Sequence, residues 1–187
     1  RKRMDQRTTE SLLFKALNEL LLKKNIDKLS VTEIIQRAGV SRATFYRYYT
    51  DKYDLLNSSY RKILEKTLFQ CRNGVPWEVT EYNLYKELQE NVKLFQNAME
   101  SQDINSLKNY IFNVSLDLFL EILKDNNVDI NDWKIRKQLE SFIYGNLELT
   151  VIWIREGCKE PVEDLIYVMN SMIPEKFKPF ILSKKTS

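Results

Sequence analysis

The side chains best suited to chemistry lie close together in one short segment. Arg42 carries a guanidinium that can form two parallel hydrogen bonds with a guanine edge, and Thr44 can hydrogen-bond a base or touch a thymine methyl group. Tyr46 and Tyr48 supply phenol hydroxyls and Lys52 supplies an ammonium group, all of which can bind phosphate. The segment therefore indicates a surface that binds nucleic acid.

Other kinds of chemistry are poorly represented. The chain has no histidine, which excludes Ser-His-Asp triads, Cys-His pairs and histidine-ligated metals. The two cysteines, Cys71 and Cys158, are far apart in the sequence and too few to form a zinc site. Two isolated cysteines are typical of a protein in a reducing compartment, and a single disulfide between them is the alternative. We therefore predict no catalytic residue, no metal ligand and no cofactor.

Local signals predict how the basic and aromatic segment is positioned. Ser30 and Glu33 fit a capping box, and apolar residues at i, i+3, i+4 and i+7 predict a short helix that begins after Ser30. Gly39 is suited to end that helix, and Ser41 can cap a second helix that runs to about Tyr49. Two short helices joined by a tight turn have the spacing of a helix-turn-helix motif.

The rest of the chain predicts helices nearly throughout. Gly and Pro number 4 each, too few for turn-rich β-sandwiches or barrels. Further helices are expected at about 8–23, 52–72, 77–100, 105–124, 132–155 and 161–173. We therefore predict an all-α fold of two parts: a three-helix helix-turn-helix DNA-binding domain at 1–52, and a helical regulatory domain, for ligand binding and dimerisation, at 53–187.

Charge is divided unevenly between the two ends. Residues 1–66 carry 15 Lys and Arg against 8 Asp and Glu, whereas residues 67–187 carry 14 against 18. A basic end suggests a polyanionic partner, although solvated helices often carry such an excess as well. The chain has no run of 18 apolar residues and no signal-like start, so we expect a cytoplasmic protein with no membrane span.

Residues 30–56, which read SVTEIIQRAGVSRATFYRYYTDKYDLL, resemble the DNA-binding segment of the TetR/AcrR family of transcriptional regulators. The matching positions are Thr32, Ala38, Gly39, Val40, Ser41, Thr44, Phe45, Tyr46, Tyr49, Lys52, Leu55 and Leu56. With the preceding helix, the resemblance covers roughly 8–57. Tyr48 stands where many members have histidine, so we expect a changed contact at that position. The tail at 142–173 resembles the C-terminal helices of one branch of the family.

The resemblance implies a homodimer that binds a near-palindromic double-stranded DNA operator and is released by a small-molecule effector. It implies base contacts from Arg42, Ala43, Thr44 and Arg47, and phosphate contacts from Thr32, Tyr46, Tyr48 and Lys52. Arg1, Lys2 and Arg3 could form a basic arm, but an unstructured charged terminus is the preferred interpretation.

The helix expected at 132–155 is apolar on all sides, so it must be buried on both sides, and a second subunit is one way to cover it. The resembled family dimerises through a four-helix bundle of two helices from each chain. The side chains expected at that interface are Leu139, Phe142, Ile143, Leu147, Val151, Ile154, Val162, Leu165, Ile166 and Met169. A central helix in a monomer is the alternative.

A ligand pocket is expected among the helices spanning about 77–155, lined by aromatic residues such as Tyr85, Phe112 and Trp133. Aromatic residues at helical spacing also pack in cores, so packing is the alternative. For the whole chain, the alternatives are an enzyme or small-molecule carrier that keeps the same scaffold, and an activator or adaptor without an effector.

Overall fold

The structure is a computed structural model that describes residues 6–182, with only the backbone described for Gln6. Arg1, Lys2 and Arg3 lie outside the described residues. The described residues form ten α-helices and two short 3-10 helices, with no strand among them, which confirms the all-α prediction. Within this part of the chain, every helix is too short or too polar to span a lipid bilayer.

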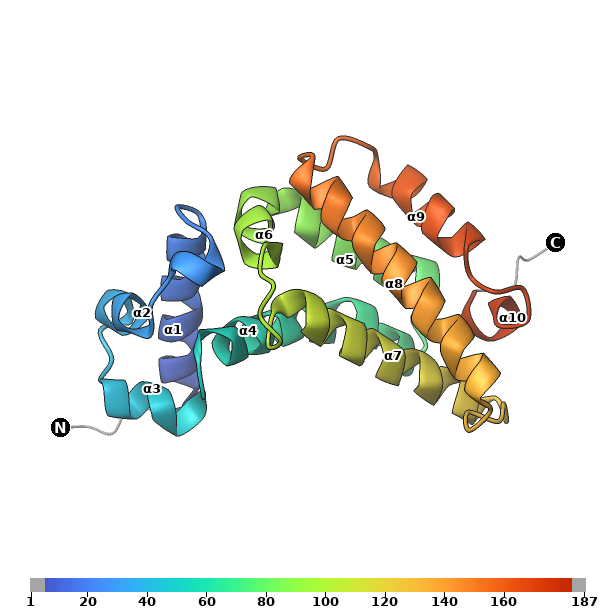
Figure 1. The fold of residues 1–187 in the computed structure, drawn as a ribbon, viewed down its shortest axis with the longest axis horizontal. Helices are drawn as coiled ribbons and strands as arrows, with labels where there is room; N and C mark the ends of the chain where they lie inside the picture. The colour runs from blue at the N-terminus through green and yellow to red at the C-terminus, as the bar shows by residue number, and fades with distance from the viewer. Residues whose placement is uncertain (1–5, 183–187) are drawn as a thin grey trace.

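The N-terminal helices form a small unit at one end of the molecule (Figure 1). Its elements are α1 (Gln6–Leu21), η1 (Ile26–Lys28), α2 (Val31–Ala38) and α3 (Arg42–Tyr48). Their apolar faces meet in a core of fully buried side chains. The core includes Leu13, Leu17, Leu21, Ile26, Ile34 and Phe45, all with 0% of their surface exposed. The helix-turn-helix motif is therefore held rigidly by α1.

The remaining helices form a larger unit, and α4 leads into it from the small one (Figure 1). Its elements are α4 (Lys52–Lys66), η2 (Leu68–Asn73), α5 (Trp77–Glu90), α6 (Val92–Met99), α7 (Leu107–Asp125), α8 (Trp133–Arg155), α9 (Val162–Ser171) and α10 (Lys178–Ile181). The long helices α7 and α8 lie against each other, and α9 packs on α5. Cys71 and Cys158 are free thiols.

Two of the expected helices are shorter in the structure, so their predicted bounds were wrong. The helix expected over 77–100 is broken at Asn91, whose side-chain Nδ2 donates to the Glu87 carbonyl at 3.0 Å. The helix expected to reach residue 72 ends at Thr67, whose hydroxyl donates to the Ile63 carbonyl at 2.7 Å. Both side chains compete with the backbone for hydrogen bonds, which favours a helix end.

Two asparagine side chains join the small unit to α6. Asn97 Nδ2 donates to the Leu21 carbonyl at the end of α1, at 2.6 Å, and Asn25 Nδ2 donates to the Glu100 carbonyl just after α6, at 3.0 Å. The two units therefore touch at α6 as well as being joined through α4. The division of the chain at residue 52 stays a prediction, and it falls at the first residue of α4.

Candidate nucleic-acid interface and internal cavity

The turn between α2 and α3 has the local structure that the sequence predicts. Ser30 Oγ accepts from the Glu33 amide at 3.2 Å, and the Glu33 carboxylate accepts from the Ser30 amide at 2.9 Å, which completes the capping box. Gly39 ends α2 with φ of 68°, in the left-handed region that favours glycine. Ser41 Oγ then caps α3 by accepting from the Thr44 amide at 3.1 Å. The chain is thereby turned within a few residues.

Aromatic packing fixes the orientation of α3. Phe45 is fully buried, and its ring lies 5.9 Å from that of Tyr49 and 5.2 Å from that of Tyr46. Because Phe45 and Tyr49 anchor one face, the opposite face of the helix points to solvent. The side chains on that face are Arg42, Ala43, Tyr46 and Arg47, all exposed, with Thr44 and Tyr48 half-buried beside them. The structure thus gathers the residues expected to touch DNA on one surface.

The starts of α2 and α3 lie side by side on this surface. Arg42 Nη2 donates to the Thr32 hydroxyl at 2.7 Å, which links the first residue of α3 to the second residue of α2. Among the described residues, neither Arg42 nor Arg47 forms an ion pair, whereas Lys24 pairs with Glu33 on the same unit. The two arginines therefore keep their charge available for a polyanion.

Lys52 has a structural role that the sequence analysis did not find. Its Nζ donates to the Asp27 and Leu29 carbonyls, each at 2.9 Å, and lies 5.1 Å from the centre of the Tyr53 ring. The Tyr53 hydroxyl donates to the Asp27 carboxylate at 2.7 Å. These bonds fasten the segment before α2 to the start of α4. An ammonium group has three N–H donors, so one donor remains for a phosphate.

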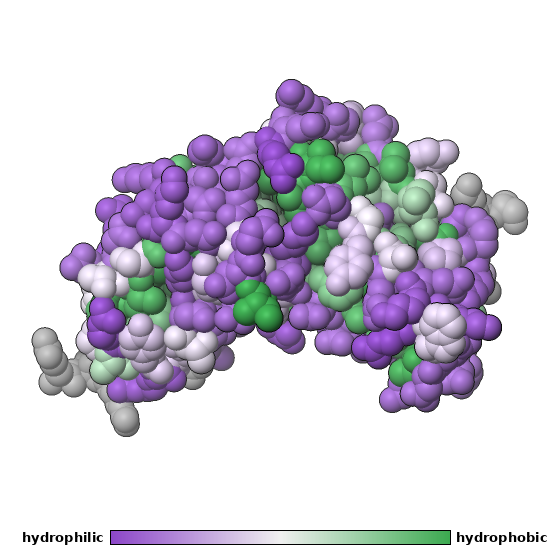
Figure 2. Space-filling view, viewed as in Figure 1, coloured by the Kyte–Doolittle hydropathy of each residue, from purple (hydrophilic) through white to green (hydrophobic). Residues whose placement is uncertain are grey.

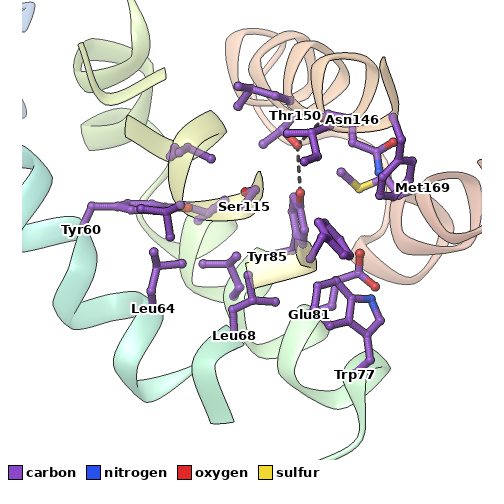
Figure 3. A pocket seen from close by; sticks show the side chains of 18 residues that line it. Tyr60, Leu64, Leu68, Trp77, Glu81, Tyr85, Ser115, Asn146, Thr150 and Met169 are labelled. Atoms are coloured by element: carbon purple, nitrogen blue, oxygen red, sulfur yellow. Dashed lines mark hydrogen bonds between the residues drawn. The ribbon is translucent and has the colours of Figure 1, made fainter. Parts of the chain in front are cut away.

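The larger unit encloses a cavity of about 80 Å3 among α4, α5, α7, α8 and α9 (Figure 3). Most of its lining is apolar or aromatic. Of the three residues expected in a ligand pocket, Tyr85 lines this cavity and its hydroxyl is hydrogen-bonded to Thr150 at 2.9 Å. The structure places Phe112 elsewhere, stacked on the exposed Tyr144 with ring centres 4.1 Å apart, and Trp133 is itself exposed at the start of α8.

Glu81 is a residue of this cavity that the sequence analysis did not select. Glu81 is 5% exposed, and its carboxyl group accepts a hydrogen bond from Asn170 Nδ2 of α9 at 2.8 Å. Burial raises the pKa of Glu81 to about 7, against the opposing effect of the Asn170 hydrogen bond. The signal was present in the sequence, because Glu81 shares the apolar face of α5 with Trp77, Leu84 and Leu88.

The side chains expected at a dimer interface on the C-terminal helices lie inside the chain itself. The ten residues named for it, from Leu139 to Met169, are all buried in the chain's own core, with at most 9% exposed. The apolar side chains that α8, α9 and the turn after them leave exposed are others: Trp133, Tyr144, Ile152, Tyr167, Val168 and Met172. Figure 2 shows hydrophobic surface over α8 and towards α9 on an otherwise mostly hydrophilic face.

Sequence models of known families match most of the chain. The model of bacterial regulatory proteins of the tetR family matches residues 13–58, and the model of a transcriptional regulator C-terminal region matches residues 77–175. Among curated proteins, the uncharacterised HTH-type transcriptional regulator YvdT of Bacillus subtilis (strain 168) is 32% identical over 60 residues. That match covers 32% of this chain and spans only 31% of the length of YvdT.

Solved structures share the fold over nearly the whole chain. A TetR transcriptional regulator from Streptococcus agalactiae 2603V matches with a TM-score of 0.66 and 22% identity, covering 90% of this chain and 95% of that one. The dihydroxyacetone kinase operon activator DhaS matches with a TM-score of 0.59 and 17% identity, over 94% and 98%. NalD, the secondary repressor of the MexAB-OprM multidrug efflux pump in Pseudomonas aeruginosa, matches with 0.55 and 17%, over 91% and 99%.

Proposed function

Because the chain belongs to the tetR family of bacterial regulatory proteins and is a DNA-binding transcriptional regulator, we propose that it acts as a homodimeric repressor. In this proposal the dimer holds a near-palindromic operator, and a small molecule in the cavity of the larger unit releases it. A chromosomal operator implies a cytoplasmic location. No catalytic step is part of the proposal.

The exposed face of α3 carries the proposal. Arg42, Ala43, Thr44 and Arg47 are the residues proposed to read base edges, because they lie at the start and along the exposed side of the helix that follows the turn. Thr32, Tyr46, Tyr48 and Lys52 are proposed to hold phosphates around it. The hydrogen bond between Arg42 and Thr32 supports a surface on which base and phosphate contacts adjoin.

A second copy of the chain is proposed to cover the exposed apolar side chains of α8 and α9. Tyr167 and Met172 are 77% and 65% exposed, which is unusual for large apolar side chains on neighbouring turns of one chain segment. Gly145, on the same exposed side of α8, leaves open space where a side chain would begin, so a partner helix can approach closely. A twofold axis here would pair the two α3 helices on one face of a duplex.

The sign of regulation rests on the family, whose similar structures include a repressor, NalD, and an activator, DhaS. Repression with release by an effector is proposed because the larger unit contains a cavity that can receive one. Activation is the second candidate, favoured by the high coverage of DhaS.

Selection of bound duplexes from a random DNA pool tests the proposal. Enriched sequences should contain two inverted half-sites with centres about one helical turn apart, on the order of 34–36 Å. A pool that shows no enrichment after several rounds would contradict sequence-specific binding. The same protein should then be screened for small molecules that release the selected duplex, and an enzyme or carrier that kept the scaffold would retain no such duplex.

A further inference from the structure

A single carboxyl group stands in a cavity whose lining is mostly apolar or aromatic. Glu81 lines the cavity together with the rings of Trp77, Tyr85, Phe119 and Phe142, and it is almost fully buried. Burying an acid among apolar side chains is unfavourable unless a partner compensates it. The Asn170 side-chain amide donates a hydrogen bond to the carboxyl group, but this amide is neutral and leaves the negative charge uncompensated.

None of the described residues around Glu81 carries a positive charge. Within the described chain, no Lys or Arg lines the cavity, and its other titratable groups are the phenols of Tyr60 on α4 and of Tyr85 on α5, of which Tyr85 interacts with Glu81. Glu78, one turn earlier on α5, adds a repulsive negative charge. The electrostatic environment of the cavity is therefore suited to a cation and opposed to an anion.

A second polar group of the cavity lies close to Glu81. The Trp77 indole N–H is buried and makes no hydrogen bond of good geometry among the described residues, yet it lies beside the Glu81 carboxyl group (Figure 3) and helps to lower the pKa of that acid. An ionised carboxylate can accept several hydrogen bonds, from Asn170, from Trp77 and from a ligand at once. A carboxyl group that keeps its own proton offers fewer acceptor positions.

Building on the proposed effector function, we propose that the ligand of this cavity is a small amphiphilic cation, with a protonated amine bound to the Glu81 carboxylate. Its apolar part lies against a cluster of aromatic rings, in which the ring centres are 5.2 Å apart for Trp77 and Phe119 and 5.5 Å apart for Phe119 and Phe142. Ring faces attract a cation as well, so the aromatic walls and the carboxylate favour the same charge.

The arrangement distinguishes ligands by charge more than by shape. A neutral ligand of the same size fills the cavity but leaves Glu81 without a counter-charge, and a carboxylate ligand adds a third negative charge to those of Glu81 and Glu78. The cavity of about 80 Å3 limits the ligand to a small body, and the flexible Met169 side chain forms part of the wall and can give way. Benzylamine, benzyl alcohol and benzoate form a matched set of probes.

Nuclear magnetic resonance of the indole N–H groups measures binding at the site itself. The chain has 3 tryptophans, so a 15N-labelled sample gives three indole signals, and the Trp77→Phe variant identifies the signal of Trp77. Trp133 is 68% exposed at the start of α8 and serves as an internal control. Each probe is titrated at pH 8 into the full chain, and each variant is checked for cooperative thermal unfolding.

Benzylamine should move the Trp77 signal and bind about tenfold more tightly than benzyl alcohol, as expected for a charge-assisted hydrogen bond, and benzoate should bind least. Glu81→Gln should remove the preference for benzylamine while keeping the shape of the site. Glu90→Gln removes an exposed acid from the same helix and should keep the preference.

Equal binding of benzylamine and benzyl alcohol, or tighter binding of benzoate, would overturn the inference and leave the cavity as a binding site for another class of ligand. A Trp77 indole signal that does not shift with any of the three probes would also overturn the inference. Binding to the selected duplex is measured on the same preparation. If the proposed DNA-binding function fails, the duplex does not bind, and this outcome is distinct from a failure of the ligand inference, which the indole signals report.

Discussion

Arg42 and Thr32 are joined by a hydrogen bond of 2.7 Å from the guanidinium to the hydroxyl oxygen, across the starts of two helices. The bond restricts the long Arg42 side chain before any DNA is bound. Less conformational freedom is then lost when the guanidinium meets a base edge. The Thr32 hydroxyl keeps its own hydrogen to donate, so it can bind a phosphate while it accepts from Arg42.

Replacement of Arg42 should reduce specificity. Arg42→Ala should weaken operator binding by roughly 1–3 kcal/mol and affect random DNA much less, because base contacts carry the sequence information. Arg37→Ala is the control, because Arg37 is an exposed arginine of α2 that pairs with Glu19. Fluorescence anisotropy on operator and scrambled duplexes measures both effects. An unchanged ratio of the two affinities would contradict the assignment of α3 as the recognition helix.

Replacement of Lys52 should have two separable effects. Lys52→Ala removes two hydrogen bonds to carbonyls, which should lower the free energy of unfolding by about 1–3 kcal/mol. If Lys52 also binds phosphate, affinity should fall similarly on all duplexes, and the slope of log K against log salt should decrease by about one per subunit contact. Thermal unfolding and a salt titration measure the two. A lower melting temperature with an unchanged slope would refute the phosphate contact.

A charge on the exposed side of α9 should split the dimer. Val168→Glu places a carboxylate among the exposed apolar residues of α8 and α9, where a partner chain would bury it. Ile104→Glu is the control, because Ile104 is 82% exposed in the loop before α7, away from those helices. Analytical ultracentrifugation at micromolar concentration should show a dimer for the wild type and for the control. A monomeric wild type would refute the proposed assembly.

The stability of the protein should depend on pH through Glu81. The pKa of this acid is raised by burial to about 7 in the folded chain, above its ordinary value of 4.5, so the folded state binds more protons between those values. The free energy of unfolding therefore falls as pH rises from about 4.5 to 7 and stays reduced above that.

The Glu81→Gln variant tests this dependence, because glutamine does not titrate and still accepts from Asn170. It should exceed the wild type in stability at pH 8 by roughly 1–3 kcal/mol, and the difference should shrink towards pH 5. Urea unfolding at the two pH values provides the measurement, with Glu90→Gln as the exposed control. A difference that does not change with pH would show that the acid titrates normally.

Local signals predicted the helix-turn-helix motif well. Ser30, Glu33, Gly39 and Ser41 act within four residues of their own positions, so their roles could be derived without knowledge of tertiary contacts. The break at Asn91 was missed, because asparagine interrupts some helices and is tolerated in others.

Tertiary relationships were harder to derive. An apolar stripe on α8 shows that a face is buried but not which surface covers it, and the stripe through Leu139 and Leu147 packs on the chain's own core. The prediction of the residues that line the cavity was limited in the same way. Phe112 and Trp133 were selected for being aromatic, whereas the distinctive residue of the cavity is Glu81, an acid whose place on the apolar face of α5 was overlooked.

Asn25 and Asn97 fasten the small unit to α6 through acceptors that belong to the main chain, at Glu100 and Leu21. A carbonyl oxygen is present whatever side chain occupies its residue. These two hydrogen bonds between the units therefore require asparagine at the two donor positions, but they require no particular side chain at the two accepting positions. Substitutions can therefore alter the side chains of the accepting segments, subject to their own packing, without uncoupling the small unit from the larger one.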